Sequence, residues 1–314
     1  SRFFLRIQRD KPSTNDKQPG WPGANYGNER MTSRILCVAT SLLLLVLSAC
    51  STAPSREVPS DPQEQPVYSN DTFVQLVKKY SVNDGEKIDY AAWKESKEDL
   101  QALDQQVALL ASVSPQNASG QFPTPATKRS YWINTYNTLV LQAVLEYWPL
   151  ESVQDVKISV SSRLVPGKGF FYDRKVTVGG RQTNLYDLEK EVLKTQKDPR
   201  LHYAFNCAST SCPVLRPYEW TDEQLDQAGH EFINNKNNVS VEAGTVRLSK
   251  IFKWYKKDFP ADILVYLQQY AEPQLKKDLQ TAFDGKYKIR YETYDWSLNA
   301  ADDEAMQSEQ NADE

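Results

Sequence analysis

The sequence predicts an α+β fold, a single domain in which several helices surround a small mixed or antiparallel sheet. Apolar residues recur at helical spacing over several long segments. Between them lie short segments with the alternation and the glycine-marked turns that are typical of strands and hairpins. The two kinds of segment do not alternate regularly, so a parallel sheet built from βαβ units is not expected.

The first predicted elements are helices. Residues 73–80 and 93–110 each carry an amphipathic pattern, and Asp84-Gly85 marks a turn between them. Residues 130–148 form the most apolar segment of the domain, and a proline follows directly. This segment predicts a buried helix that ends at the proline.

Strand signals follow in the middle of the chain. Residues 156–160 and 170–178 have strand character, and the pair Gly179-Gly180 with a short return to Asn184 predicts a hairpin. Asn184 is then placed to cap a helix that runs through Lys194.

Residues 201–206 alternate between apolar and polar side chains, which predicts a strand that is buried on one face. The other face of this strand would carry His202 and Asn206. The remaining predicted elements are a helix from Thr221, a hairpin over 239–248, a helix capped by Ser249, helices starting near Ala261 and Pro273, and a strand over 288–292.

The chain divides into five regions. Residues 1–30 are hydrophilic, do not begin with methionine and are interpreted as a mis-extended N-terminus. Residues 31–49 have the layout of a lipoprotein signal peptide, with one basic residue ahead of a short apolar stretch. Residues 50–66 form a proline-rich flexible linker, 67–299 are the globular domain, and 300–314 are interpreted as an acidic, disordered tail.

The signal ends in Leu47-Ser48-Ala49-Cys50, which resembles the bacterial lipobox. By that resemblance we expect the Cys50 thiol to carry a diacylglycerol, with palmitate as an acyl group. More than one acyl chain makes such an anchor durable, because a single chain binds a membrane only reversibly. Ser51 is not the aspartate that retains such lipoproteins in the inner membrane. We therefore expect a lipid-anchored protein on the periplasmic face of the outer membrane.

Composition excludes some functions. The formal net charge is −4, and the domain itself is nearly balanced because a run of acids lies in the tail. These tail acids are Asp302, Asp303, Glu304, Glu309, Asp313 and Glu314. No basic patch predicts nucleic-acid binding. The chain has no P-loop, dinucleotide fingerprint, HExxH or GxSxG motif, so no cofactor is expected.

The candidate chemistry lies in a loop that holds two cysteines, Cys207 and Cys212, close to His202. A structural disulfide is one interpretation, since cysteines pair in oxidising compartments, and so short a loop contributes roughly 2 kcal/mol. A second is a Cys207 nucleophile with His202 as base and Asn206 or Asn134 orienting it. A zinc site of His202, Cys207 and Cys212, without an identified fourth ligand, is the third.

Other polar residues are predicted to support this loop. Asn134 and Asn137 share a face of the apolar helix, where amides must be hydrogen-bonded. They would either hold a loop or face a substrate. Glu189 and Arg200 are predicted as a supporting ion pair of small energetic weight.

Residues 131–137, 202–213, 248–259 and 294–299, in their order and spacing, resemble the family known as domain of unknown function 547 (DUF547). The resemblance spans roughly residues 71–299. The family name carries no activity. The resemblance implies a secreted or membrane-associated bacterial domain marked by the asparagine-bearing helix and the histidine–cysteine loop.

The functional hypothesis is a periplasm-facing lipoprotein whose domain binds or processes an envelope ligand, in a cleft between the Asn134 helix and the His202 strand. An enzyme of this kind would be a hydrolase or acyl transferase that uses Cys207 and His202. The alternative is a non-catalytic binding or scaffolding module with a Cys207–Cys212 disulfide. The expected partners are the membrane, through the lipid, and an envelope ligand or protein.

Overall fold

The computed structural model describes residues 66–302. The predicted signal peptide, the lipidation site at Cys50, most of the linker and nearly all of the acidic tail lie outside the described residues. Within residues 66–302 the fold is α+β, as predicted.

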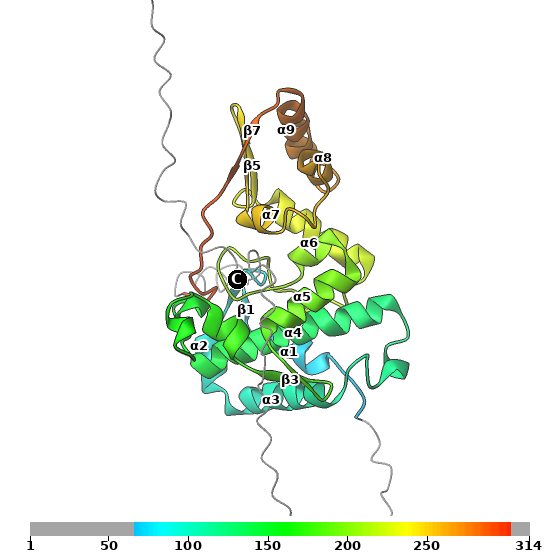
Figure 1. Ribbon diagram of the computed structural model, residues 1–314, viewed down its shortest axis with the longest axis vertical. Helices are drawn as coiled ribbons and strands as arrows, with labels where there is room; N and C mark the ends of the chain where they lie inside the picture. Colours follow the sequence, from blue (N-terminus) through cyan, green and yellow to red (C-terminus); the bar gives the residue numbers. More distant parts are fainter. Residues whose placement is uncertain (1–65, 303–314) are drawn as a thin grey trace, which may run out of the picture.

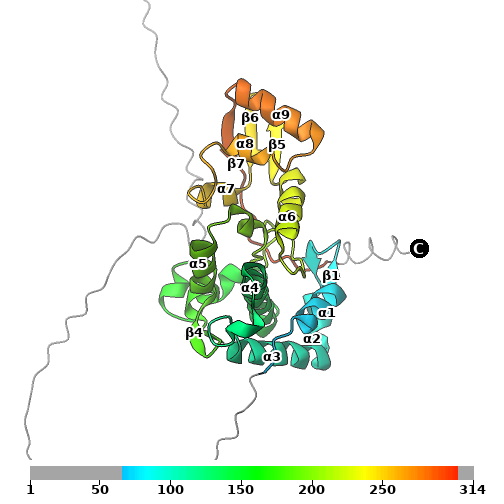
Figure 2. The same ribbon diagram turned by 90° about the vertical axis from the view of Figure 1, so that its right-hand side faces the viewer.

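The helices are α1 (Asp71–Tyr80), α2 (Tyr90–Glu95), α3 (Lys97–Ser112), α4 (Pro125–Tyr147), α5 (Leu185–Gln196), α6 (Asp222–Asn234), α7 (Lys250–Trp254), α8 (Ile263–Leu267) and α9 (Pro273–Asp284). The strands are β1 (Ser81–Val82), β2 (Lys87–Ile88), β3 (Val176–Val178), β4 (Arg181–Thr183), β5 (Val239–Glu242), β6 (Thr245–Leu248) and β7 (Lys288–Tyr291). Figures 1 and 2 show α1 to α5 in one part of the molecule, β5 to β7 with α7 to α9 in the other, and α6 between them.

The predicted buried helix is confirmed as α4, which packs against α3 and α5. Thr124 begins it with a capping box, and Pro125 occupies the first turn, where a missing N–H costs nothing. Side chains on every side of the helix are buried, as expected for a helix whose apolar residues are not confined to one stripe. The helix ends before Pro149, so its predicted C-terminus is also correct.

The sheets are small. β1 pairs with β2 and β3 with β4, both antiparallel, while β5, β6 and β7 form a mixed sheet. In that sheet β6 and β7 run parallel, with Val246 opposite Ile289. The predicted hairpin at Gly179-Gly180 is confirmed, and both glycines have positive φ, which suits a tight two-residue turn.

Two strand predictions are wrong. Residues 201–206 form no strand: Pro199–Tyr203 is a 3-10 helix, η5, whose first turn is set by the proline and by the Asp198 side chain accepting from the Arg200 amide. Alternation failed as a signal because both faces of this segment are buried. Residues 156–160 also form no strand, and of 170–178 only β3 is extended.

The wrong strand predictions over 156–160 and in the first part of 170–178 have a packing cause. Gly169–Asp173 form a π-helical turn that lies against the chain at Val156. A Cβ on Gly169 would sit 2.0 Å from the Val156 carbonyl oxygen, so the two backbones approach more closely than any larger residue permits. Because the two backbones lie this close together, these segments do not form the extended strands that were expected.

The C-terminal segment, residues 294–301, runs back from β7 across the molecule (Figure 1). The Ala301 amide donates to the Ile88 carbonyl at 2.9 Å, and the Ile88 amide donates to the Asn299 carbonyl at 2.9 Å. Ser209 of the cysteine loop bridges to Leu298 of the same segment. The segment therefore joins the last residues of the fold to one of its first strands and to the candidate site.

Candidate functional site

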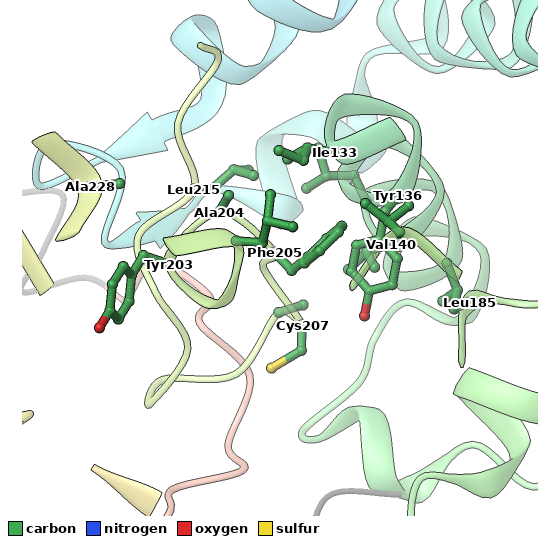
Figure 3. Packing of buried hydrophobic residues seen from close by; sticks show 14 of the residues in the cluster. Ile133, Tyr136, Val140, Leu185, Tyr203, Ala204, Phe205, Cys207, Leu215 and Ala228 are labelled. Carbon is green, nitrogen blue, oxygen red and sulfur yellow. The ribbon is translucent and has the colours of Figure 1, made fainter. Parts of the chain in front are cut away.

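The two cysteines of the loop, Cys207 and Cys212, form a disulfide, with their Cα atoms 6.1 Å apart. The disulfide interpretation of the sequence is therefore the one that the structure supports. In Figure 3 the Cys207 side chain turns away from the apolar cluster around Ile133 and Leu215, and the Tyr136 hydroxyl turns to the same side.

Asn137 of α4 fixes the start of this loop. Its side-chain amide donates to the Ala204 carbonyl at 3.0 Å, and its side-chain oxygen accepts from the Asn206 amide at 2.9 Å. Asn206 then binds within the loop, accepting from the Ala208 amide and donating to the Pro213 carbonyl. Both asparagines are buried, so these hydrogen bonds satisfy main-chain groups that have no access to water.

Asn134 anchors a different segment. Its side-chain oxygen accepts from the Trp220 indole at 2.8 Å, and its amide donates to the Tyr218 carbonyl at 2.9 Å. The helix face that carries Asn134 and Asn137 thus holds two lengths of backbone in place. In the described chain neither Asn134 nor Asn206 donates to or accepts from His202, which was the orienting role expected of one of them.

His202 is buried on η5, and its Nε2 lies 3.0 Å from the Asp258 carboxylate. Its ring packs against Tyr255, with ring centroids 4.0 Å apart. Burial lowers the pKa of His202, and the Asp258 carboxylate opposes that shift without reversing it. The imidazole is therefore neutral near neutral pH, and its hydrogen-bond partner is Asp258 rather than a cysteine sulfur.

Glu189 of α5 is buried, and its carboxylate accepts from the Tyr255 hydroxyl at 2.7 Å. Burial raises the pKa of Glu189 to about 7, and the hydrogen bond from Tyr255 opposes this shift. The predicted ion pair between Glu189 and Arg200 does not form. Arg200 instead pairs with Asp198 and Asp226, since η5 directs the guanidinium toward α6 and away from α5.

His202, Glu189 and the two cysteines line one small cavity of about 20 Å³, together with Tyr136, Tyr255 and Tyr294. A space of this size accommodates roughly one water molecule. Burial raises the pKa of Tyr136, and the nearby Glu189 carboxylate adds to that shift, although no hydrogen bond of ordinary geometry joins the two groups. The histidine, the cysteines and the glutamate named in the sequence analysis thus lie around one cavity, although Glu189 was expected there only as a partner of Arg200.

A much larger cleft, of about 540 Å³, lies on the other side of the cysteine loop. Its walls come from both parts of the molecule: Lys87 of β2, the loop from Ser209 to Val214, residues 235–238 after α6, and Glu292 after β7. Cys212 lines both this cleft and the small cavity, whereas Cys207 lines only the small cavity. The small cavity thus lies between α4 and the His202 segment, where a cleft was expected, and the larger cleft adjoins it at Cys212 and Pro213.

Four residues of the small cavity's surroundings were not assigned a role from the sequence: Tyr136, Tyr255, Asp258 and Tyr294. Their side chains reach the site from α4, from the end of α7 and from the C-terminal segment. All four lie in the segments 131–137, 248–259 and 294–299 that resemble DUF547, but that resemblance gave them no individual role. Contacts between residues this far apart in the chain leave no pattern in the local sequence, so they could not be predicted from it.

The residues described offer no metal centre. Among them no group of three or more His, Cys, Asp and Glu side chains is arranged to hold a metal ion. The proposed zinc ligands fail for a chemical reason as well, because the sulfurs of Cys207 and Cys212 are bonded to each other and are not available as thiolates.

Over residues 66–302, no helix combines the length and the apolar character that crossing a membrane requires.

A family model described as "Protein of unknown function, DUF547" matches residues 122–233. The matched region runs from the start of α4 to the end of α6, so it contains both asparagines of α4 and the whole cysteine loop. Comparison with curated proteins and comparison with solved structures found no match.

Proposed function

We propose that this chain is a lipid-anchored, extracytoplasmic binding module that holds a polar envelope ligand in the 540 Å³ cleft. The cleft is the observation that carries the proposal, because it is the space beside the loop that is large enough for a small ligand. The disulfide shapes its wall by fixing the turn between Cys207 and Cys212.

The cleft lining indicates the chemistry of the ligand. Asparagine amides and hydroxyl groups alternate there with side chains of both charges, among them Lys87, Lys236 and Glu292. Such a lining fits a ligand that carries amides, hydroxyls and charges of both signs. Peptide-substituted glycan fragments of a bacterial cell wall have all three.

The lipid anchor is the second part of the proposal and is supported by the sequence alone. Leu47-Ser48-Ala49-Cys50 has the layout of a lipobox. Mass spectrometry of the protein from its native host should find Cys50 as the lipidated N-terminal residue, and Cys50→Ser should release the protein from outer-membrane vesicles. An unmodified Cys50 with an uncut signal would refute this part.

A binding titration tests the ligand. Soluble peptide-substituted glycan fragments should bind the oxidised domain, and Lys236→Ala should weaken binding about tenfold, because hydrogen bonds to a charged group are worth about 1.5–3 kcal/mol. Lys236 is exposed and lines the cleft. Lys276→Ala, at an exposed position on α9 outside the cleft, is the matched control. Equal affinity of both variants, or no binding to the wild type, would refute the proposal.

The alternative is a hydrolase or acyl transferase with Cys207 as nucleophile and His202 as base. It requires a free thiol and a histidine that turns from Asp258 toward the sulfur. Counting alkylatable thiols on the native protein separates the two functions: none agrees with the binding module, and two with the enzyme.

A further inference from the structure

The two sulfurs of the disulfide have different surroundings. Cys207 is only 1 % exposed and faces the small cavity. Cys212 is partly exposed and lines the open cleft as well. A thiol that enters the cleft therefore reaches Cys212 and not Cys207.

Hydrogen-bond donors converge on the same pair. The Cys207 main-chain amide donates to the Cys212 sulfur at 2.8 Å. The Tyr294 hydroxyl lies 3.3 Å from each of the two sulfurs, and the Ser209 hydroxyl lies 3.0 Å from the Cys207 sulfur. The Ser209 hydroxyl donates to Tyr294, and Tyr294 donates its one proton to the Cys212 sulfur, so Tyr294 and the Cys207 amide favour a thiolate over a neutral thiol at Cys212 when the S–S bond is open.

Behind the disulfide, Glu189 is a buried carboxyl group that forms no ion pair with any residue the structure describes. It is 5 % exposed and shares the small cavity with both sulfurs. Burying a carboxyl group without a cation destabilises a fold unless the group takes up a proton. A buried carboxyl group that destabilises the fold and lies beside reactive groups indicates a functional site.

We propose that Cys207–Cys212 is a redox-active disulfide that takes two electrons from a dithiol, with Cys212 as the sulfur attacked and Glu189 as the proton donor to Cys207. The proposal goes beyond ligand binding in the cleft. Because disulfide reduction is measured without a ligand, a negative result would leave the proposed binding function standing.

The exchange proceeds in two steps. One thiolate of the dithiol attacks the Cys212 sulfur, forming a mixed disulfide while the Cys207–Cys212 bond breaks and its electron pair leaves with Cys207. The Glu189 carboxylic acid gives its proton to the Cys207 thiolate across the cavity. The second thiolate of the dithiol then attacks its own sulfur in the mixed disulfide, which releases the Cys212 thiolate into the cleft and the reductant as its disulfide.

The titration of the cluster agrees with this role for Glu189. The titratable groups that face it are Tyr136 from α4, Tyr255 after α7, Tyr294 from the C-terminal segment and His202 from η5. Burial raises the pKa of each tyrosine and lowers that of His202, so all four are neutral near neutral pH. Glu189, whose pKa is raised to about 7, is the member of the cavity that exchanges a proton there.

Reduction of the native protein by dithiothreitol tests the proton donor. Rate constants are measured by quenching with iodoacetamide and mass spectrometry from about pH 6 to about pH 8.5, for wild type, Glu189→Gln and the control Glu191→Gln. Glu191 is an exposed carboxylate on the same helix. We expect Glu189→Gln to slow reduction about tenfold at the acid end and to match the wild type within about twofold at the alkaline end, because a positioned general acid acts only while protonated. Glu191→Gln should match the wild type throughout.

Single-cysteine variants test which sulfur reacts. In Cys207→Ser the remaining Cys212 should react with a disulfide reagent in the folded protein. In Cys212→Ser the remaining Cys207 should react about 100-fold more slowly until the protein is unfolded, since thiol reactivity follows access. Circular dichroism checks the fold of each variant. If Glu189→Gln does not fold, the reactivities of the two single-cysteine variants still test the proposal.

Three results would overturn the proposal. The first is reduction of the wild type no faster than global unfolding, which would make the disulfide purely structural. The second is a ratio of wild-type to Glu189→Gln rate constants that does not change with pH. The third is Cys207 reacting as fast as Cys212 in the folded single-cysteine variants.

Discussion

Replacing Glu189 by glutamine should remove a large part of the pH dependence of stability. The folded-state pKa of Glu189 is about 7, against an ordinary value of 4.5, because the carboxyl group is buried. A raised folded-state pKa contributes stability that is fully present below the unfolded-state pKa and is lost as pH rises through the folded-state pKa. The loss therefore runs from about pH 4.5 to about pH 7.

The magnitude follows from the size of the shift. Each pKa unit corresponds to 1.36 kcal/mol, so the wild type should lose roughly 3 kcal/mol of unfolding free energy across this window through Glu189 alone. Glutamine mimics the protonated acid and still accepts from Tyr255. Glu189→Gln should thus equal the wild type at about pH 4 and exceed it by roughly 3 kcal/mol above about pH 7.5.

Urea unfolding of the oxidised protein at a series of pH values measures the difference. His202 acts in the opposite direction, because its pKa is lowered and its contribution is lost as pH falls below its ordinary value of 6.5. Subtracting the wild-type curve from the variant curve cancels that contribution. Glu191→Gln serves as control and should give a flat difference. A flat difference for Glu189→Gln as well would refute the assignment of a raised pKa to this carboxyl group.

Three further perturbations test other parts of the site. Asn137→Ala should destabilise the domain by about 2–4 kcal/mol in denaturant unfolding, because it leaves two buried main-chain groups unpaired; a loss under about 0.5 kcal/mol would contradict the anchoring role. Gly169→Ala should prevent stable folding, since its Cβ meets a backbone carbonyl at 2.0 Å, whereas Gly120→Ala, with no atom within 4 Å of the new Cβ, should leave the melting temperature within about 2 °C. Asp258→Asn should lower the NMR-measured pKa of His202 further, because the Asp258 carboxylate does more to raise that pKa than Asp198 does; an unchanged or higher value would show that the pair does not interact.

Local signals predicted most helices and hairpins correctly. Asn184 caps α5 by accepting from the Asp187 amide, and Thr221 begins α6 with a capping box, both as expected from the residues themselves. The predicted helix over 93–110 is interrupted at Ser96, where a serine that accepts from the Asp99 amide begins α3 anew. Signals of this kind act within one turn of chain, so they remain readable in a single sequence.

Tertiary packing caused the errors. The segment around His202 alternates like a half-buried strand, but α6 packs on it, Tyr255 covers the His202 ring, and the backbone coils as η5. The Glu189–Arg200 pair was plausible by charge, yet the two side chains face different helices. The cysteine loop was identified because histidines and cysteines are rare in this chain. Its tyrosines and Asp258 were not, because aromatic residues are common and most of them serve packing.

The return of residues 294–301 to Ile88 and Ser209 has a consequence for biogenesis. Tyr294, which faces both sulfurs, follows every helix and strand of residues 66–302, so synthesis from the N-terminus supplies it after all of them. The cysteine pair therefore gains this neighbour only after the preceding helices and strands have been made. A protein shortened just after β7 would leave the Ile88 main-chain groups without these partners and would remove Tyr294 from the sulfur pair, so the short closing segment is needed to complete the site.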